Sequence, residues 1–405
     1  MDISLVILTF NRAERCVSSV LQHACLLEGL SAEILVINNG QEVVDLPVQQ
    51  AGVPIRVHVM AENRGAEARN EAISLAKGAI LLYMDDDAFV QRHHVEELIA
   101  VFKAHPGTGA VAFRIFNGTR QEASLLPTVF HGCAVGISKK ALALAGGYPS
   151  GYRYYAEEYH VAFRLMQVGY CLRFLDVSPH VQHVRDASGR SKAHILQRLV
   201  VNNTRLLTSF LPWRYWGGAM CDMLQRYRLV AAKEAVRIGF WRGLLAFPRS
   251  FARGVRERTP LSDILFAEVA LLPQLERAAV FLGEMEQKQV VLCGCGRFPR
   301  LWIDFLQKRG IKVLAILDTN PCWKQQRIAD VPVFGGLETL DFGSFVIVHG
   351  LSSFAETDYW NDLLLADPSW RVLVGKKGHT REKDAAKSGA LLSEKCVITL
   401  FYRAK

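Results

Sequence analysis

The chain has 405 residues, of which 50% are hydrophobic and 21% are charged, a balance that excludes a wholly disordered protein. Lys and Arg number 48 against 39 Asp and Glu, which gives a formal net charge of +9. The nine cysteines are scattered without Cys-x-x-Cys spacing, which argues against a zinc cluster or a disulfide framework and fits a reducing compartment. No run reaches 18 apolar residues, so no transmembrane helix is expected.

Short β-rich runs alternate with helical stretches from residue 1 to about residue 188. Strands are expected at Ile3–Leu8, Ile34–Ile37, Arg56–Val59, Ile80–Met84, 110–116 and 130–137. Helices are expected at 12–29, at 66–77 with Gly78 as its cap, and at 157–168 before Gly169. This alternation predicts a mostly parallel sheet that helices cover on both faces. No basic segment precedes the first apolar run, so we expect a buried strand there and not a signal peptide.

Residues 189–285 are predicted to be mainly helical and basic. Between residues 189 and 280 there are 15 Lys and Arg against 6 Asp and Glu, so this segment carries the whole net charge of +9. Arginines interleaved with aromatic residues suit the surface of an anionic membrane, and a solvated helical face explains the pattern equally well. No helix-turn-helix, RNP or zinc-finger pattern is present, which argues against a nucleic-acid partner.

Residues 286–405 return to an alternation of strands and helices. The expected elements are a strand at Gln289–Cys293, a helix at 298–309 and a strand at Ile311–Leu317. Gly294 and Gly296 lie between the first strand and the helix, and Asp318 follows the second strand, as in a dinucleotide-binding turn. Pro299 replaces the third glycine of that pattern, which favours a structural or oligomerisation domain without a ligand over an oxidoreductase.

Polar clusters follow each of the first four predicted strands. The clusters are Thr9-Phe10-Asn11-Arg12, Asn38-Asn39-Gly40, Glu62-Asn63-Arg64-Gly65 and Asp85-Asp86-Asp87. Because ligands of open parallel sheets bind beyond the carboxyl ends of the strands, we expect the four clusters to border one cleft. Turn chemistry alone explains one such cluster better than it explains four.

The acids after the fourth strand are candidates for a cation site. On an extended chain Asp85 and Asp87 point to one side and Asp86 points to the other. Two carboxylates on one side offer the hard oxygen ligands that Mg²⁺ and Mn²⁺ prefer, and His183 is a candidate third ligand. The alternative is a solvated acidic turn.

Glu157 and Glu158 begin the helix predicted at 157–168. The helix dipole favours acids in a first turn, and this effect alone explains the pair. The functional alternative is a general base that takes a proton from an acceptor hydroxyl.

The order of these motifs resembles glycosyltransferase family 2, whose members have the GT-A fold, and most resembles the rhamnosyltransferase-type bacterial members. The resemblance covers about residues 2–190 and is carried by residues 6–12, 36–40, 62–70, 84–87 and 145–149, the Glu157-Glu158 pair, Arg164, Gly169-Tyr170 and His183. It implies a GT-A glycosyltransferase domain at 1–188 and a basic helical extension at 189–285. Residues 286–405 resemble the Rossmann-like modules found with bacterial sugar-modifying enzymes.

The resemblance implies an inverting transfer of a sugar from a nucleotide diphosphate sugar to a hydroxyl of a glycan or lipid-linked acceptor, in bacterial cell-envelope polysaccharide synthesis. It implies a divalent cation, Mn²⁺ or Mg²⁺, held by Asp85, Asp87 and His183. It makes Glu158 the base, with Glu157 as the alternative. The residues it places at the nucleotide sugar are Thr9, Asn11, Arg12, Asn38, Asn63, Gly65, Arg69, Asp85 and Asp86. A cytoplasmic location is expected, at the inner face of the membrane if the basic segment binds there.

Two residues depart from the family pattern. Asn38 and Glu158 both stand where the family usually has Asp. An amide can donate as well as accept a hydrogen bond, which puts the identity of the donor base in doubt, and the extra methylene of Glu158 changes its reach. These departures leave open a second interpretation, a non-catalytic nucleotide-sugar-binding or scaffold protein.

Overall fold

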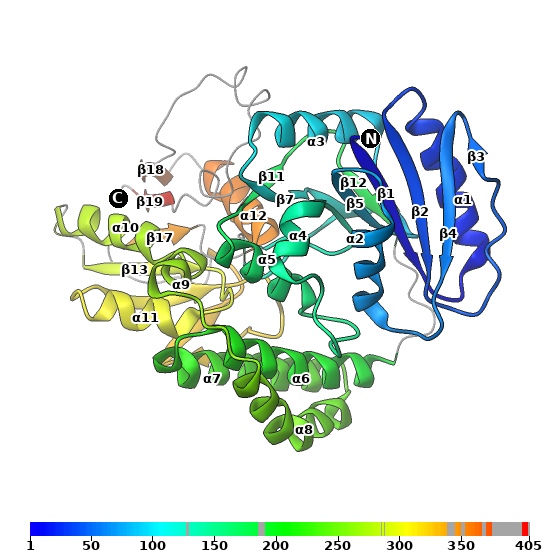
Figure 1. Cartoon of the computed structure of the whole chain (residues 1–405). Helices are drawn as coiled ribbons and strands as arrows, with labels where there is room; N and C mark the ends of the chain where they lie inside the picture. Colours follow the sequence, from blue (N-terminus) through cyan, green and yellow to red (C-terminus); the bar gives the residue numbers. More distant parts are fainter. Residues whose placement is uncertain are drawn as a thin grey trace. The chain divides into compact units, whose positions relative to one another are not determined.

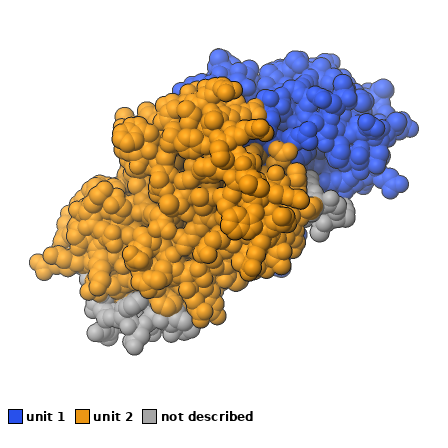
Figure 2. Space-filling view, turned by 90° about the horizontal axis from the view of Figure 1, so that it is seen from below, with its two compact units in different colours: residues 1–123, 129–189, 381–392 blue, residues 124–128, 190–380, 393–405 orange. Residues whose placement is uncertain are grey.

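The computed structural model describes residues 1–126, 129–184, 191–284, 286, 288–337, 345–349, 353–366, 370–374 and 399–403 (Figure 1). They form two compact units, coloured in Figure 2. The first consists mainly of Met1–Ala123 and Val129–Gly189, and the second mainly of Arg190–Thr380. The second unit includes both the segment predicted as a helical extension and the one predicted as a Rossmann-like domain.

An eight-stranded mixed sheet forms the centre of the first unit, in the order β11-β7-β10-β5-β1-β2-β4-β3. Its strands are β1 (Ile3–Thr9), β2 (Ala32–Asn38), β3 (Gln49–Gln50), β4 (Val53–Val59), β5 (Ile80–Asp85), β7 (Thr108–Phe113), β10 (Ala134–Ser138) and β11 (Cys171–Leu175). Strands β1, β2, β4 and β5 run parallel, and β10 runs antiparallel between β5 and β7. All residues of β1 and β2 are buried, as expected for a mostly parallel sheet with two covered faces.

Helices pack on this sheet from two sides. On one face, α1 (Ala13–Leu26) and α3 (Arg92–Ala104) share a core with alternate residues of β1 and β5, such as Leu5 and Leu82. The other face carries the 3₁₀-helix η1 (Gly65–Asn70), α2 (Glu71–Leu75), α4 (Lys139–Ala145) and α5 (Glu157–Gln167). There the hydroxyl of Tyr83 in β5 donates to the carbonyl of Arg69 at 3.0 Å.

A four-stranded sheet, in the order β6-β12-β8-β9, brings distant segments to the acidic loop after β5. Its strands are β6 (Ala88–Phe89), β8 (Ile115–Asn117), β9 (Arg120–Glu122) and β12 (Val181–His183). Antiparallel pairing sets His183 opposite Ala88, and the N–H of Val184 donates to the carbonyl of Asp87 at 2.8 Å. This register places the His183 ring beside Asp87.

The predicted helix at 66–77 is wrong in its type and its end. It is a 3₁₀-helix followed by α2, which ends at Leu75, and Ala76 already has extended backbone angles. Gly78 is therefore not a helix cap. A Cβ there would collide with the backbone of Ile3 and Ser4, so glycine is needed where the chain enters β5 against β1.

Two predicted strands are shorter than expected. The run 110–116 divides at Arg114, because β7 belongs to the large sheet and β8 pairs with β12 in the smaller one. The run 130–137 becomes strand only at Ala134. The residues before Ala134 form the loop that carries Cys133.

Helices begin the second unit and confirm the predicted helical character of this segment. They are α6 (Lys192–Phe210), η2 (Trp213–Tyr215), α7 (Trp216–Lys233), α8 (Arg237–Arg256), α9 (Asp263–Val269) and α10 (Leu272–Glu284). Helix α8 packs on α6 through small residues: a Cβ on Gly243 would lie 2.7 Å from Cβ of Val200, and Ser250 donates to the carbonyl of Val201 at 2.5 Å. No helix in the described part of the chain has the length and hydropathy that crossing a bilayer requires.

A seven-stranded sheet follows, in the order β15-β16-β14-β13-β17-β19-β18. Its elements are β13 (Gln289–Cys293), α11 (Pro299–Gln307), β14 (Lys312–Leu317), β15 (Arg327–Ile328), β16 (Val331–Phe334), β17 (Val346–His349), α12 (Phe354–Ala366), β18 (Trp370–Val374) and β19 (Thr399–Arg403). The parallel strands β16-β14-β13-β17 have the 3-2-1-4 order of a Rossmann sheet. This order confirms the predicted Rossmann-like topology.

Contacts within the second unit already fill the predicted dinucleotide turn. Asp318 accepts a hydrogen bond from the N–H of Cys295 at 2.7 Å. The carboxylate of Asp222 accepts from the N–H of Arg300, in the first turn of α11, at 3.3 Å. A helix N-terminus of this kind is where a pyrophosphate would bind, so the internal carboxylate takes the place of such an anion.

Candidate active site

The acidic loop is tied to the end of β1 by buried polar contacts. The hydroxyl of Thr9 donates to Asp86 at 2.8 Å, and Arg12 lies 3.0 Å from Asp86 and 3.1 Å from Asp87. Burial raises the pKa of Asp86 to about 6, against the opposing effects of Arg12 and Thr9. The oxygens of Asp86 thus contact Thr9 and Arg12, and one nitrogen of Arg12 bridges Asp86 and Asp87, so the expected opposite orientation of these two side chains is not observed.

Asp87 and His183 form a charged pair with little solvent exposure. Oδ1 of Asp87 is 3.2 Å from Nε2 of His183, and the side chains are 8% and 7% exposed. Burial disfavours both charges, but the hydrogen bond between them outweighs it. The pKa of Asp87 falls to about 2, with a contribution from Arg12, and the pKa of His183 rises to about 12, with contributions from Cys133 and Glu122.

Asp85, the last residue of β5, meets Arg69 of η1. Nη2 of Arg69 is 2.7 Å from Oδ1 of Asp85 and 3.4 Å from the carbonyl of Gly132. Arg69 is 3% exposed and lies 5.5 Å from the centre of the Tyr148 ring. Burial would lower the pKa of Arg69, but Asp85 and other nearby acidic groups raise it, so this buried side chain stays charged.

Glu158 approaches the same place from α5. A Cβ on Gly132 would lie 2.7 Å from Oε1 of Glu158, so this approach depends on glycine at position 132. The neighbouring Cys133 carbonyl accepts a hydrogen bond from the N–H of Asp85 at 3.0 Å. The acidic loop and the base predicted from sequence therefore border a single short segment, residues 132–133.

The two glutamates of α5 differ in environment. Glu157 is 3% exposed, and its Oε2 has no hydrogen-bond partner among the described residues. Burial, and secondly the charge of Glu158, raise the pKa of Glu157 well above its usual range, while Arg69 opposes them. Glu158 is only half-buried. The raised pKa favours the protonated form of Glu157.

The backbone before α5 is held in an unusual shape. Arg153, Tyr155 and Ala156 all have positive φ values, of 58°, 75° and 71°. A Cβ on Gly65 would lie 2.5 Å from the carbonyl oxygen of Arg153, and the N–H of Ala66 donates to that oxygen at 2.6 Å. Gly65 thus lets η1 contact the loop that leads to Glu157 and Glu158.

The loops after β2 and β4 are joined by asparagines. Asn39 donates to Oδ1 of Asn63 at 3.0 Å, and that oxygen also accepts from the N–H of Gly65 at 2.9 Å. Asn38 donates to the carbonyl of Glu42 at 2.7 Å and accepts from the N–H of Gly40 at 3.0 Å. An aspartate could not make the first of the two Asn38 bonds, which gives a structural reason for asparagine at this position.

Asn11 joins the loops after β1 and β2. Its backbone is left-handed, with φ of 49°, and its side-chain oxygen accepts from the N–H of Gln41 at 3.0 Å. Together with the contacts above, this bond brings the ends of β1, β2 and β4 into one connected network. The polar clusters expected to meet at this edge of the sheet do so.

Asp85, Asp87 and His183 can hold a cation. One ligand atom from each lies within 4.8 Å of the others. Two carboxylates and an imidazole suit Mn²⁺, and they suit Mg²⁺ when water completes its shell. The residues present therefore fit the expected divalent ion.

Several residues of the site were not predicted from sequence. Glu122 lies 2.7 Å from Nδ1 of His183, and Cys133 and His131 lie beside it. Burial lowers the pKa of His131, but Cys133 and the carboxylates of Glu158 and Glu122 outweigh burial and raise it to about 9. The only sequence sign of these residues was that His131 and Cys133 lie within the run 130–137, which was predicted to be a strand.

Comparison with known proteins finds a family match for residues 4–140. Residues 4–140 match the model of glycosyl transferase family 2. The "Uncharacterized glycosyltransferase YwdF" of Bacillus subtilis (strain 168) is 30% identical over 130 residues, which are 31% of this chain and 48% of that protein. The chain thus spans about half the length of this curated relative.

Similar solved structures have low sequence identity. Residues 1–349 of TarS from S. aureus are 13% identical, with 76% of this chain and 90% of that chain covered and a TM-score of 0.46. The mannosyltransferase PcManGT from Pyrobaculum calidifontis, in complex with GDP-Man and Mn²⁺, is 14% identical, with coverage of 76% and 86% and a TM-score of 0.38.

The family match and the mixed sheet agree with the resemblance inferred from the motifs. Residues 4–140 are a glycosyltransferase family 2 domain, and the predicted family and GT-A fold class are confirmed.

Proposed function

We propose that this chain is an inverting, metal-dependent glycosyltransferase that moves a sugar from a nucleotide diphosphate sugar to an acceptor hydroxyl. The observation that supports this most is the convergence of Glu158 and the acidic loop on residues 132–133, where Arg69 bonds both Asp85 and the Gly132 carbonyl. Transfer from a diphosphate to an alcohol requires a base on one side of the reacting atoms and a cation-binding centre for the diphosphate on the other.

Asp85, Asp87 and His183 would hold Mn²⁺ or Mg²⁺, which would neutralise the negative charge that develops on the leaving diphosphate. Arg12 and Arg69 hold the carboxylates of this set in place through ion pairs of 3.1 and 2.7 Å. The remaining predicted nucleotide-sugar residues, Thr9, Asn11, Asn38, Asn63, Gly65 and Asp86, order the loops around this centre and would border the nucleotide.

Glu158 would take the proton of the acceptor hydroxyl as it attacks the sugar carbon. Glu157 keeps its own proton because it is buried beside a second carboxylate, so it serves poorly as a base at neutral pH. Attack from the side opposite the leaving diphosphate would invert the anomeric centre.

We further propose a glycan or lipid-linked acceptor of the bacterial cell envelope, reached at the cytoplasmic face of the membrane. The small residues of α8 face α6, and the opposite side of α8 exposes Ile238, Trp241 and Leu245 by 55%, 60% and 84%. Arg242 and Arg249 are exposed next to this apolar stripe. Apolar side chains flanked by arginines suit the interface of an anionic bilayer.

The test uses a panel of UDP-, GDP- and dTDP-sugars with and without Mn²⁺, with thermal shift for binding and nucleoside diphosphate release for turnover. The proposal predicts Mn²⁺-dependent release by the wild type, and Glu158→Gln should lower it by about 10²–10⁴ while donor binding persists. Donor binding without turnover, with or without candidate acceptors, would favour the alternative of a non-catalytic binding or scaffold protein.

A further inference from the structure

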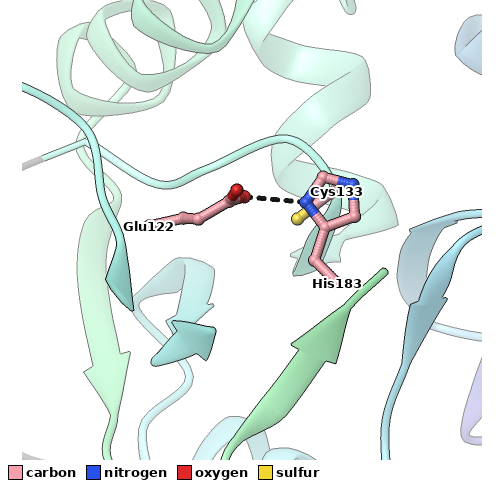
Figure 3. A group of neighbouring side chains, drawn as sticks. All are labelled: Glu122, Cys133 and His183. Atoms are coloured by element: carbon pink, nitrogen blue, oxygen red, sulfur yellow. Dashed lines mark hydrogen bonds and ion pairs between the residues drawn. The ribbon is translucent and has the colours of Figure 1, made fainter. Parts of the chain in front are cut away.

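Glu122, Cys133 and His183 form a compact group beside the acidic loop (Figure 3). They come from β9, from the loop before β10 and from β12. One ligand atom from each lies within 4.8 Å of the other two, and Oε2 of Glu122 is 2.7 Å from Nδ1 of His183. Cys133 is 2% exposed and His183 is 6% exposed, so the group is shielded from solvent. The sugar transfer proposed above gives no role to Glu122 or to the thiol.

We propose that Glu122, Cys133 and His183 form a second metal site that takes Zn²⁺. Zinc favours thiolate, imidazole and carboxylate ligands, and two ligands of a tetrahedral zinc lie about 3.5 Å apart. The three ligand atoms here lie within 4.8 Å of one another. The thiolate ligand gives this site a different metal preference from the Asp85–Asp87 pair, whose oxygens suit Mn²⁺ or Mg²⁺. Three protein ligands leave a fourth position open.

Binding of the ion releases protons to solvent. The thiol of Cys133 loses its proton, and the proton shared by Nδ1 of His183 and Glu122 is replaced by the metal.

The two metal sites share His183. Its Nδ1 faces Glu122, and its Nε2 lies 3.2 Å from Asp87. A neutral imidazole has one nitrogen lone pair for a metal, so Zn²⁺ on Nδ1 leaves Nε2 as an N–H that donates to Asp87. Zinc thus removes a ligand from the oxygen-rich site and weakens Mn²⁺ binding there. This antagonism rests on the proposed function, whereas Zn²⁺ binding itself does not.

Cobalt is the probe for the thiolate site, because Co²⁺ accepts the same ligand types and its thiolate complexes have a strong charge-transfer absorption. We expect an absorption band that saturates at one equivalent of Co²⁺ and disappears when Zn²⁺ is added. Cys133→Ser should abolish the band, and Cys25→Ser, which removes an exposed thiol of α1, should keep it. No band in the wild type, or an equal band in Cys133→Ser, would overturn the proposal.

Glu122→Gln tests the site without changing the thiol. It should keep the native far-ultraviolet circular dichroism and lower Co²⁺ affinity by about tenfold or more. Unchanged affinity would remove Glu122 from the site.

Electron paramagnetic resonance of free Mn²⁺ measures the antagonism. Zn²⁺ should weaken Mn²⁺ binding by about fivefold or more in the wild type and not in Cys133→Ser. Equal Mn²⁺ affinity with and without Zn²⁺ would refute the antagonism. A cobalt band in a protein that never turns over a donor would refute the proposed function and leave the zinc site standing.

Discussion

Replacing Asp87 by Asn removes one negative charge while keeping the shape of the side chain. In the wild type this carboxylate lies between Arg12 at 3.1 Å and His183 at 3.2 Å. At an effective dielectric constant of 20, each of these pairs is worth about 5 kcal/mol before the cost of desolvation is subtracted. Because the carboxylate is only 8% exposed, solvent screens these pairs weakly.

The substitution removes the carboxylate that Arg12 and His183 share, so these two cationic side chains lose their common ion-pair partner. Breaking a buried ion pair from one side costs about 3–5 kcal/mol, and the nearby Asp86 offsets part of that for Arg12. We therefore expect Asp87→Asn to lower the free energy of unfolding by about 3 kcal/mol. Saturating Mn²⁺ should stabilise the wild type by about 2.7 kcal/mol at a hundredfold excess over Kd, and the variant far less.

The matched control is Asp176→Asn. Asp176 also pairs with an arginine, Arg114, at 3.3 Å, but its side chain is 27% exposed. Its loss should cost less than about 1 kcal/mol and leave the Mn²⁺ effect intact. Urea unfolding with and without Mn²⁺ measures both quantities. The reasoning is refuted if the two variants lose equal stability, or if Asp87→Asn keeps the wild-type response to Mn²⁺.

Three further predictions follow from the contacts. Gly132→Ala should displace Glu158 and lower donor turnover by about tenfold or more. The control Gly107→Ala, where a Cβ meets nothing within 4 Å, should keep the wild-type rate. Equal rates for the two variants would contradict the proposed placement of Glu158. Glu33 is buried, but hydrogen bonds from the Lys77 N–H, Ser4 and Arg56 outweigh burial and lower the pKa of Glu33. The ionised carboxylate therefore stabilises the fold above pH 4.5, and this stabilisation is lost as the pH falls through the lowered pKa. Glu33→Gln should therefore cost about 2 kcal/mol at pH 7 and less in acid, and a pH-independent difference in urea unfolding would contradict this. Trp241→Ser with Leu245→Ser should reduce binding to anionic liposomes in sedimentation assays while donor hydrolysis stays unchanged, and the matched change Val280→Ser, on α10, should have little effect.

The structure changes the choice of arginines for a membrane test. The basic segment suggests Arg226 as readily as Arg242 from sequence alone. In the structure Arg226 contacts the carbonyl of Gly296 and lies 5.9 Å from the centre of the Trp323 ring, so it contributes to packing of the second unit. Charge composition located the segment but could not tell which of its arginines are exposed.

The parallel strands and their polar ends were predictable because local patterns fix them. A continuous apolar run such as Ile3–Thr9 predicts a buried central strand. The apolar run of β5 likewise predicts a buried strand, and the acids follow directly at its end. The proximity of His183 to Asp85 and Asp87 was predictable as well, because His183 closes a family motif.

Glu122 and Cys133 could not be predicted in the same way. Glu122 reaches the site through the β8–β9 pairing in the smaller sheet, and its surrounding residues have no apolar periodicity. Cys133 is placed by the late start of β10, which no residue near it signals. Both depend on long-range pairing, which local propensity does not encode.

The most direct test of the proposed mechanism is nucleoside diphosphate release from the best-binding donor, measured in Mn²⁺, after EDTA, and after Mn²⁺ is restored. We predict release that chelation abolishes and Mn²⁺ recovers in the wild type, with no recovery in Asp87→Asn. Release that continues unchanged in EDTA, or donor binding without release under all three conditions, would contradict a metal-dependent transfer at this site.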